Sequence, residues 1–103
     1  MRLTQPQRRT IVDAARQAFG SGVGVRLFGS RVDDDRRGGD FDLYIETRLA
    51  DPDQLIRARE RFLCLLDASP ALEGEKIDVI LNSPLHQQPR PIDRVARAEG
   101  IRL

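Results

Sequence analysis

Two aspartates, Asp40 and Asp42, are the residues whose type and spacing point most directly to chemistry. They open a segment, 40–47, that alternates with the period of two typical of a β-strand. We expect Phe41, Leu43 and Ile45 on the core face, and Tyr44 and Glu46 on the other face with the two aspartates. This alternation turns both carboxylates to one face, about 6.6–7 Å apart along the chain. Like charges repel at that distance and Mg²⁺ prefers hard oxygen ligands, so the pair predicts a divalent-cation site. An exposed carboxylate rim without a cation is the alternative interpretation.

A third carboxylate, Asp78, stands in the β-branched segment 76–81, where a charge is unusual. We expect this segment to be a second central strand that adds Asp78 to the pair. An Asp-x-Asp pattern alone is weak support, because the chain contains two more, within 33–35 and 51–53. Capping of a helix explains the pair within 51–53, and a solvated loop explains the one within 33–35.

The tripeptide Gly29-Ser30-Arg31 follows an apolar strand-like run, 23–28. Glycine lets the backbone approach an anion closely, serine donates from its N–H and its hydroxyl, and arginine adds a positive charge. A plain turn is the alternative for these three residues taken alone. Together with the carboxylates, they predict a phosphate-binding turn beside a metal site.

The elements that must position these residues alternate between helix and strand. A capping box of Thr4 and Gln7 and apolar periodicity predict a helix at 5–19. A second helix is predicted from 51 to about 68, with Ile56 in its buried stripe, and Gly100 stops a short helix at the C-terminal end. Strands are expected at 23–28, 40–47 and 76–81. This order predicts an α/β (α+β) fold, a small mixed β-sheet with helices packed on it.

Bulk properties predict one soluble globular domain over residues 1–103. Hydrophobic residues make up 40% of the chain, and the net charge of +1 excludes a global field that would attract nucleic acid. The single cysteine, Cys64, cannot form an intramolecular disulfide and is expected to be buried. His86 has no cysteine or histidine partner for zinc. The chain has no membrane-length apolar run and no apolar signal segment, so we expect a cytoplasmic protein.

The three-part pattern resembles a known signature. Gly29-Ser30, then Asp40-Phe41-Asp42-Leu43, then a later strand with Asp78, is similar to that of the DNA polymerase beta-like nucleotidyltransferase superfamily. More narrowly, the chain resembles the minimal nucleotidyltransferase (MNT) group, which are single small domains. The resemblance covers nearly the whole chain and implies the polymerase beta-like nucleotidyltransferase fold.

The resemblance implies a role for each matching residue. Gly29, Ser30 and Arg31 would bind the nucleotide triphosphate, while Asp40 and Asp42 would ligate Mg²⁺. Asp78 would be the third carboxylate of a two-metal site, where it would bind the second metal or help to deprotonate the attacking hydroxyl. Such a site would transfer AMP from ATP.

The resemblance also implies a partner. The segment 91–100 is similar to the closing helix of bacterial MNT proteins that are encoded beside a HEPN-domain protein. The expected acceptor is therefore a tyrosine of a HEPN ribonuclease toxin, which AMP transfer would silence, so the chain would act as an antitoxin. We expect no membrane partner and no strong nucleic-acid binding, with homo- or hetero-oligomers left open.

Two departures from the family pattern leave a second function open. Gly39 stands where the family often has serine before the Asp-x-Asp pair, and Asp33–Asp35 place negative charge beside the implied triphosphate site. The alternative is therefore a binding module that neutralises a HEPN partner by occlusion, without catalysis. A third possibility, transfer of AMP to a small molecule or to RNA, requires substrate surfaces that larger relatives add as extra domains.

Overall fold

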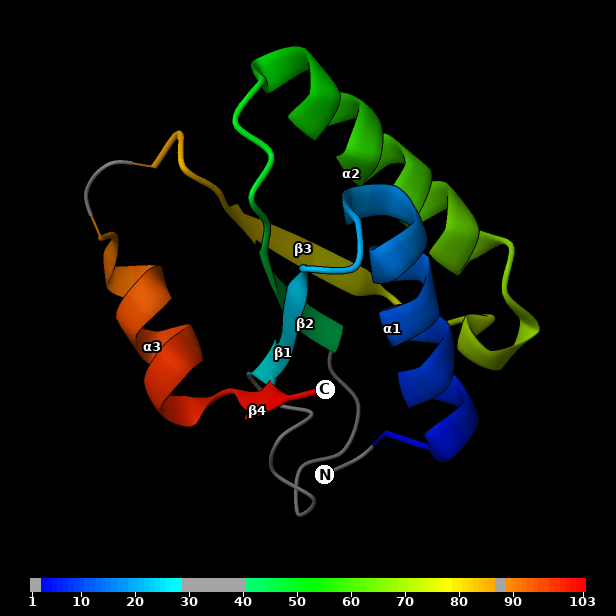
Figure 1. Cartoon of the computed structure of the whole chain (residues 1–103). Coiled ribbons are helices and arrows are strands. Elements are labelled where there is room, and N and C mark those ends of the chain that lie inside the picture. Colours follow the sequence, from blue (N-terminus) through cyan, green and yellow to red (C-terminus); the bar gives the residue numbers. More distant parts are fainter. Residues whose placement is uncertain (1–2, 29–40, 87–88) are drawn as a thin grey trace.

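The computed structural model describes residues 3–28, 41–86 and 89–103, which form a four-stranded mixed sheet with helices on it (Figure 1). The predicted fold class is confirmed. The elements in chain order are α1 (Gln5–Phe19), β1 (Gly24–Phe28), β2 (Phe41–Glu46), α2 (Pro52–Asp67), the 3₁₀ helix η2 (Pro70–Leu72), β3 (Ile77–Asn82), α3 (Pro91–Glu99) and β4 (Ile101–Arg102).

Local capping explains where the two long helices begin. At the start of α1, Gln7 N donates to Thr4 Oγ1 at 3.2 Å and Thr4 N donates to Gln7 Oε1 at 3.0 Å, so the predicted capping box is present. At the start of α2, the Asp51 side chain accepts from Asp53 N at 3.1 Å. Both caps satisfy backbone N–H groups that have no partner within the helix.

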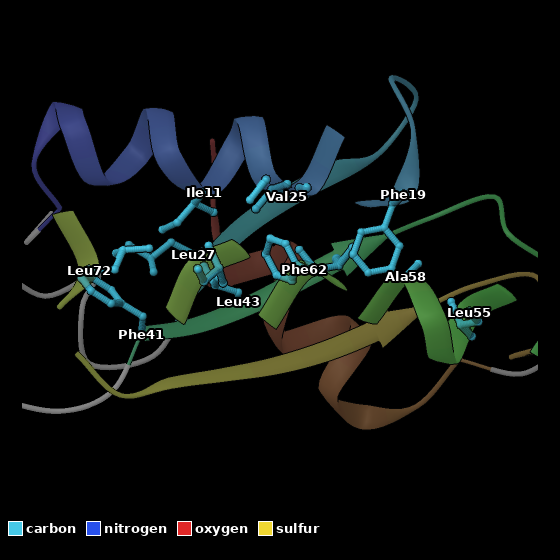
Figure 2. Close-up of a cluster of buried hydrophobic side chains, with 14 residues drawn as sticks. Ile11, Phe19, Val25, Leu27, Phe41, Leu43, Leu55, Ala58, Phe62 and Leu72 are labelled. Atoms are coloured by element: carbon cyan, nitrogen blue, oxygen red, sulfur yellow. The ribbon is translucent and has the colours of Figure 1, made fainter. Parts of the chain in front are cut away.

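The main core lies between the sheet and the pair α1 and α2, which contact each other on one face (Figure 2). The predicted inward residues of β2, Phe41, Leu43 and Ile45, are all fully buried there. Phe19 of α1 and Phe62 of α2 pack edge to face, with ring centroids 5.7 Å apart. This core anchors the strand that carries Asp42.

Two expectations for α2 are wrong. Ile56 was predicted to belong to the buried stripe but is 57% exposed, and Cys64 is exposed rather than buried. Both residues belong to a helix that is rich in apolar side chains but packs against the rest of the protein along one face only. Position on the helix therefore decides burial here, and apolar character does not.

The opposite face of the sheet is covered by α3. Phe28, Tyr44 and Ala96 form a second buried cluster there, and Ile80 and Ile92 pack against it. Tyr44 was expected on a polar, carboxylate-bearing face, but it is fully buried. The even-numbered face of β2 is thus a second, smaller packing surface.

The strand order is β3-β2-β1-β4, with β2 and β3 parallel and the other pairs antiparallel. In the described part of the chain β3 is an edge strand, so the expectation that it is central is wrong. The short strand β4 and the helix η2 were not predicted. None of the described helices combines the length and the apolar character needed to cross a bilayer.

Candidate metal and nucleotide site

Asp42 and Asp78 lie side by side, although 36 positions separate them in the sequence. They are register partners in the parallel pair of β2 and β3. Neighbouring strands lie about 4.8 Å apart, and register partners point to the same face of a sheet. The tertiary structure therefore brings together two of the three predicted carboxylates.

The remaining predicted site residues, Asp40 and the tripeptide Gly29-Ser30-Arg31, lie outside the described residues. The strands that flank them in the sequence are described. Phe28, which precedes the tripeptide, is the register partner of Asp42 in the antiparallel pair of β1 and β2. The ends of β1, β2 and β3 thus place Phe28, Asp42 and Asp78 in one row across the sheet.

The surroundings of the two carboxylates differ. Asp42 is half-buried, next to Phe28, whereas Asp78 is exposed on the edge strand. Phe28 and Tyr44, two residues further along β2, belong to the buried cluster under α3. The pair is therefore bordered by an apolar surface on one side and is open to solvent on the other.

Two carboxylates in this arrangement suit a hard cation. Like charges directly opposite on neighbouring strands destabilise a sheet, and a divalent ion between them removes the repulsion. Mg²⁺ is usually bound through one or two carboxylates and keeps its other positions for water and substrate phosphates. Within the described residues no group of three or more metal-binding side chains occurs. Asp42 and Asp78 are the two residues there that fit the ion.

A buried polar network lies on the same face of the sheet and attaches α3 to it. The Tyr44 hydroxyl donates to Asp93 Oδ1 at 2.7 Å. Arg90 donates to the same carboxylate, from its backbone N to Oδ2 at 2.6 Å and from its guanidinium to Oδ1 at 3.1 Å. The Arg90 guanidinium also donates to the Leu81 carbonyl oxygen at 2.7 Å, which links the start of α3 to β3.

The network changes the acidity of both of its acidic groups. Hydrogen bonds from Arg90 hold the pKa of Asp93 well below its usual range, against the opposing effect of burial. Burial, together with the hydrogen bond to Asp93, raises the pKa of Tyr44 from 10.0 to about 12. At neutral pH the network therefore consists of a carboxylate, a guanidinium and a neutral phenol.

Sequence reasoning missed this network. Pro91 and Asp93, in the first and third positions of α3, are typical of the first turn of a helix, where an acidic residue is favourable. That pattern indicated a helix start, but it did not indicate which strand the helix would cover. The other indication of a covered face was Tyr44, a single aromatic residue among the polar positions of β2.

Comparison with models of protein families finds no match for this chain, and comparison with curated proteins finds none either. The functional interpretation therefore depends on the residues themselves and on the sheet that positions them.

Proposed function

We propose that this chain is a Mg²⁺-dependent nucleotidyltransferase that transfers AMP from ATP to a protein hydroxyl. The proposed acceptor is a tyrosine of a HEPN ribonuclease toxin, so the chain acts as a cytoplasmic antitoxin. The observation that carries the proposal is the register of Asp42 and Asp78 on neighbouring parallel strands. The resemblance of the sequence to nucleotidyltransferases independently implies that both residues bind metal.

In the proposed reaction the tyrosine oxygen attacks the α-phosphorus of ATP. A new phosphorus–oxygen bond forms, the bond to the bridging oxygen of the β-phosphate breaks, and pyrophosphate leaves. Asp78, the more exposed of the two described carboxylates, accepts the hydroxyl proton. Asp42 and Asp78, with Asp40, would hold Mg²⁺, which would neutralise charge on the phosphates.

Metal binding is tested separately from activity. Mn²⁺ replaces Mg²⁺ at oxygen-ligand sites and broadens the NMR signals of nearby nuclei. We expect a low Mn²⁺ concentration to broaden the amide signals of Phe28, Asp42 and Asp78 first. Asp42→Asn and Asp78→Asn should each abolish that selective broadening, whereas Asp13→Asn, on the exposed surface of α1, should not. Equal broadening in all four proteins would contradict the metal site.

Catalysis is tested with ATP labelled on its α-phosphate, Mg²⁺ and the protein encoded by the neighbouring gene. We expect the label to appear on a tyrosine of that protein, and the Asp42→Asn/Asp78→Asn double variant to lower the labelling rate at least about 100-fold. Asp13→Asn is again the matched control.

The same double variant distinguishes the non-catalytic alternative. If it still rescues cells from the toxin while labelling is absent in every protein, the chain neutralises its partner by occlusion. Labelling that persists in the double variant would overturn the roles assigned to Asp42 and Asp78.

A further inference from the structure

A basic pocket opens at the end of β1 and β2 opposite the candidate metal site. It has a volume of about 320 Å³, and the residues that line it include Gly22, Gly24, Arg26, Glu46, Arg48 and Arg102. Glu46 ends β2 and Asp42 lies near its start, so about 13 Å of strand separates the pocket from the carboxylate pair. The pocket is therefore a different location from the proposed catalytic site.

Two of its arginines face each other directly. Arg26 and Arg102 are register partners in the antiparallel pair of β1 and β4. Like charges in this arrangement destabilise a sheet. An anion that contacts both guanidinium groups would reduce this repulsion.

The nearby carboxylate, Glu46, balances only part of this charge. Glu46 Oε1 accepts from Arg26 Nε at 3.0 Å, and Glu46 Oε2 lies 3.5 Å from an Arg97 guanidinium nitrogen on α3. Within the described residues no ion pair reaches Arg48 or Arg102. The three arginines and one glutamate of the lining leave an excess of two positive charges.

The backbone at Gly22, one of the lining residues, leaves room for a ligand. A Cβ atom at Gly22 would have the Arg48 side chain as its nearest neighbour, at 3.9 Å, so the backbone is open there. Guanidinium groups bind phosphate oxygens through paired N–H donors. The described lining has no aromatic or aliphatic side chain, so it offers no surface on which a nucleic-acid base would stack.

We infer that this pocket is a second ligand site, and that it binds the phosphate groups of a small polyphosphate. The excess of two positive charges matches a ligand with at least two negative charges. The volume is at the lower end of the range for small-molecule pockets, which suits a diphosphate group better than a large organic ligand. The inference is independent of the proposed function.

The test uses inorganic pyrophosphate as the probe, at constant ionic strength and without divalent cations. It is performed on the Asp42→Asn/Asp78→Asn double variant, so that the proposed catalytic site does not bind metal. We expect the largest amide NMR shifts at Gly22, Gly24 and Arg26. Arg48→Gln and Arg102→Gln should each weaken binding at least about tenfold, because each removes a charged hydrogen-bond donor. Arg59→Gln, on an exposed position of α2, should leave the affinity unchanged.

Four results would overturn the inference. One is the absence of saturable binding at millimolar pyrophosphate, and another is equal affinity in the Arg48, Arg59 and Arg102 variants. The third is tighter binding of a single-stranded RNA oligonucleotide than of pyrophosphate, dependent on Arg102, which would assign the phosphates to nucleic acid. Shifts confined to Phe28, Asp42 and Asp78 would place pyrophosphate at the other end of the sheet and would likewise contradict it.

Discussion

Tyr44 and Asp93 show how one buried contact determines the chemistry of two side chains. Tyr44 is fully buried and Asp93 is 4% exposed, so neither group can exchange its partner for water without moving α3. The hydrogen bonds from Arg90 stabilise the charged carboxylate. The phenol stays protonated because its hydroxyl donates a hydrogen bond to that carboxylate. A buried charge of this kind is tolerated only with such partners.

The alkaline behaviour of Tyr44 follows from its raised pKa. Ionisation in the folded state is expected at about pH 12, against 10.0 for an ordinary tyrosine. Between these values the folded state retains a proton that the unfolded state has lost, so the stability from this group declines as the pH rises above about 10. Tyr44 is the only tyrosine and the chain has no tryptophan, so near-ultraviolet phenolate absorbance reports this group alone. A native midpoint near 10 would show that the hydroxyl is not buried against Asp93.

Helix α3 is short, from Pro91 to Glu99, and contacts the sheet through one small apolar cluster, the Arg90–Asp93–Tyr44 network and an ion pair between Arg97 and Glu46. Helices α1 and α2, by contrast, share the main core with the sheet. We therefore expect α3 to be the element whose attachment responds most to the loss of a polar side chain.

The acid behaviour of α3 follows from the lowered pKa of Asp93. The stability from this carboxylate is present above the ordinary aspartate value and is lost as the pH falls below about 4. Asp93→Asn removes the charge that Arg90 faces and should cost about 3 kcal/mol at pH 7. Urea unfolding of both proteins from pH 7 to pH 2 should show their stabilities converging. Asp13→Asn is the control, and a constant difference across that range would contradict the prediction.

Across the whole molecule, the C-terminal residues connect elements that are far apart in the sequence. Leu103 N donates to the Val25 carbonyl oxygen at 2.8 Å, and the Arg8 guanidinium donates to the Leu103 carbonyl oxygen at 3.0 Å. The chain passes from α3 on one face to β4 at the sheet edge through Gly100 (Figure 1). This connection also sets Arg102 opposite Arg26 in the basic pocket.

Gly100 makes that passage possible by its lack of a side chain. A Cβ atom there would collide with the Ala96 carbonyl oxygen, which accepts the Gly100 N–H at 2.8 Å. Gly100→Ala should therefore lower the free energy of unfolding by about 1–3 kcal/mol, as measured by urea denaturation. Gly22→Ala, where the nearest atom is 3.9 Å away, should change it by less than about 0.5 kcal/mol. Equal effects of the two substitutions would show that β4 does not depend on this close approach.

The local part of this structure could be predicted from the sequence. The capping pattern at Thr4 and Gln7 placed α1 at its observed bounds, and the alternation from Phe41 to Ile45 identified the inward face of β2. These features depend on residues within a few positions of one another, and their physical causes are hydrogen bonding at helix ends and burial with a fixed period.

The features that depend on tertiary structure are non-local. The covering of Tyr44 by α3, the edge position of β3 and the register that sets Asp42 beside Asp78 all depend on how distant segments pair. No local pattern encodes a register, because it is set by the packing of whole faces against each other. Residue types and local spacing identify the side chains that can do chemistry, and the pairing of the strands determines which of them meet.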